Sequence, residues 1–251
     1  MNESVTIENR DAVSLITMTG YPNRGNAMSA LLAGELLRVI QIAVDDPAIR
    51  CIVLAGTSRY FCVGADLKES FGFKAVDSVL AGWMSGLDSL RKCPKPIIAA
   101  VRGAAIGGGL ELALYCDLIV ASEDAKFALP ETGIGVIAGQ GGSQRVAALA
   151  GRSVATDMIL TGRVLSGTEA YALGIVARVA ETEKVLEVSM QMASDIADRG
   201  PAAVQFAREV IFEATEGALR QSLRIERLLA ALVLETKDAQ TRIGGFLERK
   251  R

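Results

Sequence analysis

Three runs of strand length in this chain are fully apolar: residues 51–55, 97–101 and 118–121. A strand that faces water on one side alternates apolar and polar residues, so a continuous apolar run indicates burial on both sides. Segments with helical patterns separate these runs. The alternation predicts an α/β fold with a parallel sheet that is covered on both faces.

Helical patterns dominate the chain from about Gly141 onward. Before that point, Val13–Met18 is a further strand-like run, and Ser29 is expected to cap a helix that runs to about Val44. The spacing predicts other helices over residues 77–91, 108–115, 146–160, 168–173, 183–199, 201–214 and 218–235, with a strand-like run at 175–179. We expect an α/β core followed by a helical tail in one cooperative unit.

The chain contains no histidine. This excludes Ser-His-Asp and Cys-His catalytic arrangements and every metal site that uses histidine. The four cysteines have no zinc-ribbon or thioredoxin-type spacing, so we expect no metal and interpret them as small buried residues in a reducing compartment. Acid–base chemistry near neutral pH must then use carboxylates, lysine, cysteine or tyrosine with shifted pKa values.

The charge balance and hydropathy restrict the partners. Lys and Arg number 27 and Asp and Glu number 29, a net charge of −2, which gives no basic field for nucleic acid or anionic membrane. The first residues lack the pattern of a secretory signal. No apolar run is as long as the about 18 to 20 residues that a membrane-spanning helix needs. We therefore expect a soluble cytoplasmic protein. The mean hydropathy of +0.31 suggests that apolar surface is buried between subunits.

A glycine run opens the predicted helix that carries Glu111. Residues 105–113 read AIGGGLELA, and glycines at the start of a helix let a ligand approach bare backbone N–H groups at the positive end of the helix dipole. Glu111 lies three residues after Gly108, one turn along the same face, and is flanked by leucines. It is either a partly buried, hydrogen-bonded structural residue or a carboxylate with a shifted pKa.

A second carboxylate, Glu131, follows a proline in the segment FALPETGIG (127–135). It could simply cap a turn, but Glu111 and Glu131 are the only credible acid–base pair in the absence of histidine. Desolvation and mutual repulsion would raise at least one pKa toward neutrality. The segment FCVGADLKE (61–69) reads only as a loop with free backbone donors.

Two other patterns are weaker. Gly133, Gly135 and Ala138 fit a dinucleotide-binding spacing, but Pro130 precedes them where a strand should lie. Ser143 fails the G-x-S-x-G pattern at its last position. We interpret neither as a site.

Taken together, these segments resemble the enoyl-CoA hydratase/isomerase (crotonase) family, nearly end to end. The resemblance is carried by several motifs in order, which are residues 21–29 (YPNRGNAMS), 61–69, 101–113 with 116–118, 127–145, and 246–250 (FLERK). The chain departs from the usual pattern at Gly25 and Ala138, where leucine and proline are common, and it lacks a terminal proline.

The resemblance implies a site residue by residue. Glu111 and Glu131 match the two catalytic glutamates, and the second is expected to exchange the proton at the α-carbon. The N–H groups of Val63 and Gly108 would form the oxyanion hole for a thioester carbonyl. The other implied positions are Gly139 for the water and Ala65, Asp66, Leu67 and Lys68 for the substrate and its CoA portion.

The resemblance also implies an activity and an assembly. Because both glutamates are present, the expected reaction is addition of water to a 2-enoyl-CoA thioester to give the 3-hydroxyacyl-CoA, with no metal or redox cofactor. An isomerase or specialised dehydratase on the same scaffold, or a non-catalytic CoA-binding subunit, are the alternatives. The family fold is a spiral of ββα units. We expect residues 1–195 to form this core with the active site, and residues 196–251 to form a helical region that builds a homotrimer or a hexamer.

Overall fold

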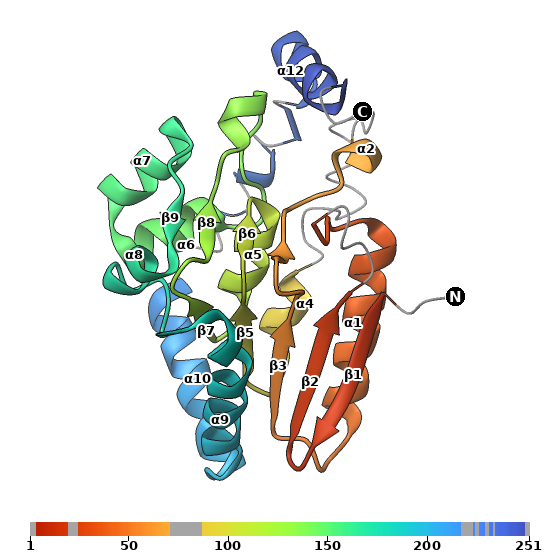
Figure 1. The fold of residues 1–251 in the computed structure, drawn as a ribbon, viewed down its shortest axis with the longest axis vertical. Helices are drawn as coiled ribbons and strands as arrows, with labels where there is room; N and C mark the ends of the chain where they lie inside the picture. The colour runs from red at the N-terminus through yellow and green to blue at the C-terminus, as the bar shows by residue number, and fades with distance from the viewer. Residues whose placement is uncertain are drawn as a thin grey trace.

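The computed structural model describes residues 4–19, 25–70, 87–216, 223, 226–228, 231, 232 and 234–248. Two β-sheets form the centre of the molecule, with helices around them (Figure 1). The predicted α/β class is confirmed. The ranges 77–91 and 218–235, predicted as helices, fall largely outside the described residues.

The larger sheet has six strands in the order β1-β2-β3-β5-β7-β10. Only the β1–β2 pair is antiparallel; the other neighbours are parallel, with Val53 opposite Ile98 and Ala99 opposite Ile119. The strands are β1 (Val5–Arg10), β2 (Val13–Met18), β3 (Cys51–Ala55), β5 (Ile97–Val101), β7 (Leu118–Ser122) and β10 (Arg178–Ala180).

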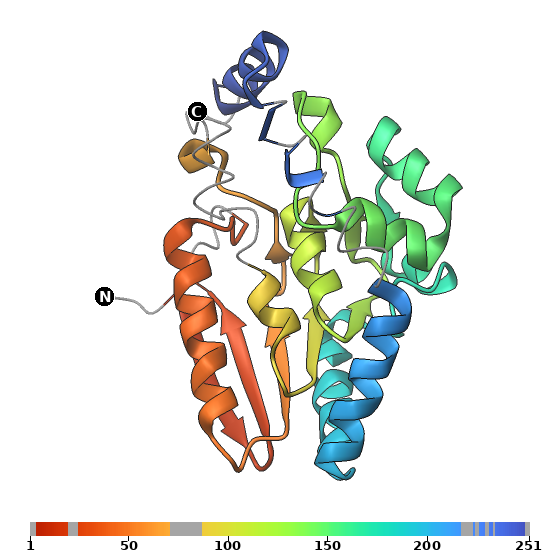
Figure 2. The same cartoon turned by 180° about the vertical axis from the view of Figure 1, so that it is seen from behind.

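Both faces of this sheet are buried, as the apolar runs predict. Ile52 and Leu54 of β3 belong to the main core, which includes apolar residues of α1 (Ala30–Asp45) and α5 (Gly108–Tyr115). Cys51 and Val53, which point to the other face, pack in a second core with α9 (Val185–Ala197). Helix α9 is in front in Figure 1, and α1 and α4 (Asp88–Arg91) are in front in the view from behind (Figure 2).

The smaller sheet was not predicted. It has the order β4-β6-β8-β9 and consists of β4 (Tyr60–Cys62), β6 (Ala104–Ile106), β8 (Lys126–Ala128) and β9 (Leu165–Ser166). Each of β3, β5 and β7 leads through a short turn into the next strand, which lies in this smaller sheet. The pairs β3–β4, β5–β6 and β7–β8 therefore repeat one strand–turn–strand unit, and α5 follows the second pair. This succession matches the ββα units of the expected spiral. Strands of two or three residues are too short to show a pattern of alternation.

Most other predicted elements are found with shifted ends. Ser29 caps α1 by accepting the Leu32 N–H at 3.1 Å, as expected. The helix predicted over 146–160 is two helices that meet at Gly151. The strand predicted over 175–179 overlaps β10 only at its last two residues, because residues 175–177 are not strand. The remaining described helices are α2 (Leu67–Ser70), α6 (Gly142–Ala150), α7 (Arg152–Thr161), α8 (Gly167–Ala172), α10 (Pro201–Glu216), α12 (Lys237–Glu248) and the 3-10 helices η3 (Glu131–Ile134) and η4 (Thr182–Lys184).

The C-terminal part of the chain packs back onto the core. Arg208 of α10 forms a largely buried ion pair with Asp117, with its Nε 2.8 Å from Oδ1. Ala239 and Ile243 of α12 pack with Val136 in a small separate core. Helix α12 thus covers the loop that follows η3. The division predicted at residue 195 stays a prediction; it falls within α9.

Candidate active site

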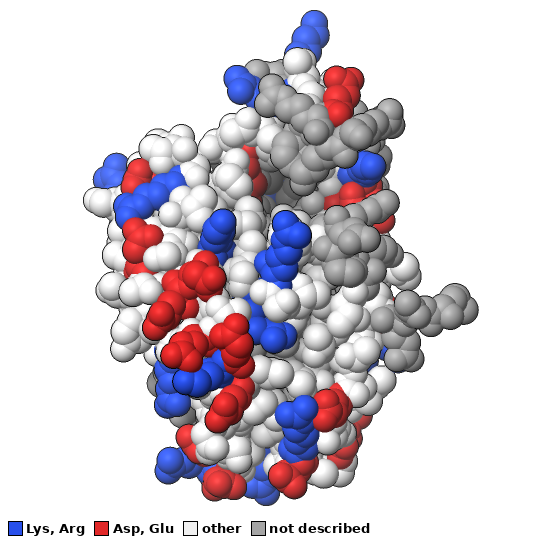
Figure 3. Space-filling model, viewed as in Figure 1, with Lys and Arg blue, Asp and Glu red and all other residues white. Residues whose placement is uncertain are grey.

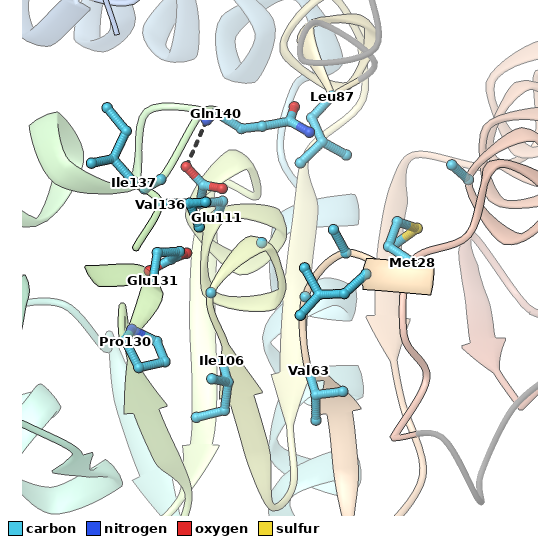
Figure 4. A pocket seen from close by; sticks show the side chains of 18 of the residues that line it. Met28, Val63, Leu87, Ile106, Glu111, Pro130, Glu131, Val136, Ile137 and Gln140 are labelled. Atoms are coloured by element: carbon cyan, nitrogen blue, oxygen red, sulfur yellow. Dashed lines mark hydrogen bonds between the residues drawn. The ribbon is translucent and has the colours of Figure 1, made fainter. Parts of the chain in front are cut away.

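A largely apolar cavity of about 590 Å³ lies between α1, the β4–α2 connection, α5 and the loop after η3. Figure 4 shows Glu111 and Glu131 on one side of this cavity and Met28 and Val63 on the other. Most of its walls are aliphatic side chains and backbone. The lining includes seven of the predicted site residues and Gln140, which donates to Glu111: Val63, Ala65, Leu67, Gly108, Glu111, Glu131, Gly139 and Gln140.

Glu111 reaches this cavity from the first turn of α5. Helix α5 is buried nearly all round, and Glu111 is only 3% exposed. Its Oε1 accepts two backbone N–H groups, from Gln140 at 2.7 Å and from Gly142 at 2.9 Å. Burial raises the pKa of Glu111, while these two amides, Arg145 and the Gly139 amide oppose the rise by stabilising the carboxylate. These hydrogen bonds offset part of the free-energy cost of burying a carboxylate at Glu111.

Glu131 is the first residue of η3, directly after Pro130. Burial raises its pKa to about 8, and the charge of Glu111 adds to the rise. The hydrogen bond from its own backbone N–H opposes this rise. Glu131 is thus a carboxyl group that holds its proton at neutral pH, next to one that is stabilised as a carboxylate.

Gly107 leaves the space that Glu131 occupies. A Cβ atom at Gly107 would lie 3.0 Å from Glu131 Oε1, and its φ of +57° is one that side chains rarely adopt. The glycine run before Glu111 thus has a second role, which is to admit the other carboxyl group.

Val63 and Gly108 follow paired strands of the smaller sheet. Parallel pairing of β4 with β6 places Cys62 opposite Ala105, and the two amides expected to form the oxyanion hole lie just beyond. The Gly108 N–H is at the start of α5, and no described group accepts it. The Val63 N–H donates to the Gly25 carbonyl at 3.1 Å. One of the two expected donors is therefore free and the other is engaged.

The other predicted site residues divide into two groups. Gly139, Ala65 and Leu67 line the cavity. Asp66 and Lys68 do not: the Asp66 side chain accepts the Lys68 N–H at 3.0 Å, and Lys68 is exposed at α2. The segments expected to shape the acyl pocket are 70–87 and 136–139. Of these, Leu87 and residues 136–139 line the cavity, whereas residues 71–86 are outside the described part.

Sequence reasoning missed Glu226. This residue is 7% exposed, and its Oε2 accepts the Gly141 N–H at 2.8 Å. Leu223, three residues earlier, is also buried. The available signal in the sequence was the spacing of Leu223 and Glu226, which places them one helical turn apart on the same face.

The two weaker patterns do not form sites. Gly133 and Gly135 lie in and after η3 instead of a strand-to-helix turn, and Ser143 lies in the first turn of α6. Among the described residues, no group of three or more Cys, Asp or Glu side chains could hold a metal ion. In the same part of the chain, no helix has the length and apolar character needed to cross a bilayer.

Comparison with known proteins identifies the family of this chain. The family model described as enoyl-CoA hydratase/isomerase matches residues 8–251. The chain belongs to the enoyl-CoA hydratase/isomerase family. It is 39% identical over 249 residues to a probable enoyl-CoA hydratase of Rhizobium meliloti, covering 99% of this chain and 96% of that protein.

More specialised members of the family are also similar. The 2,3-dehydroadipyl-CoA hydratase of Escherichia coli is 36% identical over 245 residues, covering 97% of this chain and 95% of that one. The crystal structure of carnitinyl-CoA hydratase from Mycobacterium avium superposes with a TM-score of 0.87 at 32% identity, covering 99% and 97% of the two chains. The predicted family and crotonase-like fold are confirmed, and these relatives support the expected hydratase activity.

Proposed function

We propose that this enzyme adds water across the 2,3 double bond of an enoyl-CoA thioester, with Glu111 and Glu131 as the acid–base pair. The observation that carries the proposal is the unequal environment of the two carboxyl groups that face one apolar cavity. Glu111 receives two backbone N–H groups, and Glu131 is partly buried with a pKa of about 8. This is the pairing of one base with one acid that addition of water requires.

The proton transfers follow from these environments. Glu111, as the carboxylate, takes a proton from water as the water oxygen bonds to the β-carbon. Glu131 gives its proton to the α-carbon. The pair holds one proton before and after the reaction, on Glu131 before hydration and on Glu111 afterwards. Dehydration starts from this second arrangement, so both directions need the singly protonated pair.

The thioester oxygen gains negative charge during this reaction. We assign the Gly108 N–H and the Val63 N–H as its donors, with the Gly108 donor at the positive end of α5. The thioester oxygen must then take the place of the Gly25 carbonyl on Val63. Gly139 is assigned to position the water, and residues 65–68 to bind the CoA portion. The reaction needs no metal or redox cofactor.

The cavity wall favours an uncharged acyl chain. Among the described lining residues, Glu111 and Glu131 are the only ionisable ones, and none is a cation. A free carboxylate on the acyl chain would meet the carboxylate of Glu111 and no compensating positive charge. We propose a neutral acyl group, in contrast to the dicarboxylic substrate named for the Escherichia coli relative.

We further propose that the chain assembles as a homotrimer or as a hexamer of two trimers. Phe206, Val210 and Ile211 expose 59% to 70% of their surface on one side of α10. Three large apolar side chains grouped on one helix are typical of a surface that is buried by another chain. Light scattering should give three or six times the 26.5 kDa of one chain, and Phe206→Glu should dissociate it.

The activity is tested by the loss of the conjugated-enoyl absorbance of crotonyl-CoA. Glu131→Gln should reduce kcat by about 10²- to 10⁴-fold, because an amide cannot supply the proton. Glu187→Gln, on the exposed side of α9, is the matched control and should keep full activity. A 3-enoyl-CoA offered in parallel reports isomerisation. Turnover of that substrate alone, or CoA binding without turnover of either, would contradict the proposal.

A further inference from the structure

Glu226 is a third buried carboxyl group near the pair, and it does not line the cavity. It is helical, as are the neighbouring described residues 227 and 228, and it lies far along the chain from Glu111 and Glu131. Its Oε2 accepts the Gly141 N–H, and its Oε1 is buried with no hydrogen-bond partner among the described groups. Burying this carboxyl group costs free energy, which the Gly141 amide and the side chains of Ser143 and Gln144 offset only in part, since its pKa is still raised.

Three consecutive amides connect Glu226 to the proposed site. The N–H groups of Gln140 and Gly142 go to Glu111 Oε1, and the N–H between them, of Gly141, goes to Glu226. These amides form the N-terminus of α6, which has no side-chain cap of its own. Two carboxylates from distant parts of the chain therefore satisfy the orphan donors at the start of this helix.

The stretch that carries Glu226 is anchored on both sides. Arg227 Nη2 lies 2.6 Å from Asp88 Oδ1, which also accepts the Tyr115 hydroxyl at 2.8 Å. Leu223 fills the space beside Gly141: a Cβ at Gly141 would lie 2.7 Å from Leu223 Cδ2. Gly141 has a φ of +87°, so the loop has this shape only with glycine at that position. Glu226 is thus fixed relative to both α4 and the loop.

We propose that Glu226 is a positioning residue for the hydration reaction, since by accepting the Gly141 N–H it fixes the loop whose neighbouring amides hold the Glu111 carboxylate. The inference rests on the proposed function of Glu111. Without the acceptor at Gly141, residues 140–142 can rotate, and the two donors to Glu111 lose their alignment. Gly139, the residue assigned to the water, directly precedes these amides.

The charge of Glu226 has a second effect on the pair. Burial and Glu111 raise the pKa of Glu226 to about 7, and the Gly141 amide, Ser143 and Gln144 oppose the rise. Once ionised, Glu226 contributes to the raised pKa of Glu131. The other charged or titratable groups around it are Glu111 and Tyr115 on α5, Arg145 on α6, Arg227 on its own stretch and Asp88 on α4. Removing this one charge should lower the pKa of Glu131.

Two substitutions distinguish the role of Glu226 as a hydrogen-bond acceptor from the effect of its negative charge. Glu226→Gln keeps an oxygen for the Gly141 N–H but is neutral, and Glu226→Ala removes both. We expect Glu226→Ala to lower kcat by about 10- to 100-fold with KM for crotonyl-CoA near the wild-type value, because misplaced reacting groups affect the chemical step. Glu226→Gln should restore most of kcat while the alkaline limb of its pH profile moves to lower pH. Glu187→Ala and Glu187→Gln are the matched controls.

Two measurements without turnover keep this test independent of the proposed function. Hydrogen exchange at Gly141 should be faster in Glu226→Ala and close to wild type in Glu226→Gln. The pKa of Glu131, followed by carboxyl ¹³C NMR, should fall in Glu226→Gln, a variant that retains the packing if Glu226→Ala does not fold. Unchanged exchange at Gly141, or an unchanged Glu131 pKa, overturns the proposal. The wild type could instead be inactive on every enoyl-CoA while the variants still show the changed exchange at Gly141 and the lowered Glu131 pKa. That outcome would refute the hydratase function and leave the positioning role of Glu226 intact.

Discussion

The carboxylate of Glu111 raises the pKa of Glu131, which burial has already raised, to about 8. We expect the two groups to share one proton at neutral pH and to titrate as a coupled pair. Because Glu111 is the one stabilised by backbone N–H groups, the proton lies mainly on Glu131.

The first prediction concerns the pH dependence of turnover. As pH rises through about 8, the pair loses its single proton, so kcat/KM for crotonyl-CoA should fall, approaching tenfold per pH unit. The equilibrium between enoyl and hydroxyacyl thioesters releases no proton, so kcat/KM for dehydration of 3-hydroxybutyryl-CoA should fall in parallel. Rates of both directions measured from pH 6 to 10 check this. A dehydration rate that rises with pH would contradict a shared proton.

The second prediction concerns stability. The Glu131 pKa is about 8 in the folded chain and near 4.5 when unfolded. Between these values the unfolded state binds fewer protons, so the folded state loses stability as pH rises. Glu131→Gln has no such loss, and its free energy of unfolding should exceed that of the wild type by roughly 2 to 4 kcal/mol at pH 9 and by much less at pH 4.5. Urea titrations at fixed chain concentration measure the difference. Equal differences at both pH values would argue against a buried, protonated Glu131.

The third prediction compares two glycines. Gly107→Ala should lower the free energy of unfolding by about 1 to 2 kcal/mol because of its positive φ. It should also displace Glu131 Oε1 and lower kcat by about 10- to 100-fold.

Gly34 provides the control, since it is an exposed glycine in α1 with no atom within 4 Å of an added Cβ. Gly34→Ala should raise stability by about 0.5 to 1 kcal/mol and leave kcat unchanged. Thermal melts and crotonyl-CoA assays distinguish the two. Full activity in Gly107→Ala would show that Glu131 has room to move.

The fourth prediction concerns the engaged amide. When a thioester such as acetoacetyl-CoA binds, its carbonyl oxygen should replace the Gly25 carbonyl on the Val63 N–H. The ¹⁵N–¹H resonances of both Val63 and Gly108 should then shift. The Arg50 N–H, which donates to the Ala12 carbonyl at 2.7 Å away from the cavity, is the reference and should shift less. A shift at Gly108 alone would mean that Val63 keeps its bond to Gly25.

The electrostatic surface agrees with a small-molecule substrate. On the face seen in Figure 3, Lys and Arg side chains are interspersed with Asp and Glu side chains, and they form no continuous basic field. The net charge of −2 already indicated this.

The sequence alone determined the burial of the central strands, the cap of α1 at Ser29 and the carboxyl groups that are candidates for acid–base chemistry. Residues 51–55 and 97–101 could be assigned to a doubly covered sheet because every side chain in them avoids water. The absence of histidine left Glu111 and Glu131 as the acid–base pair, and both face one cavity.

Only the tertiary structure decided how these carboxyl groups differ. Two amides 29 and 31 residues along the chain hold Glu111, Gly107 makes room for Glu131, and Glu226 arrives from 85 residues beyond Gly141. The strands of the smaller sheet were equally invisible, since two or three residues carry no period. Local patterns report whether a residue avoids water, whereas a pKa depends on which distant groups the fold brings within a few ångströms.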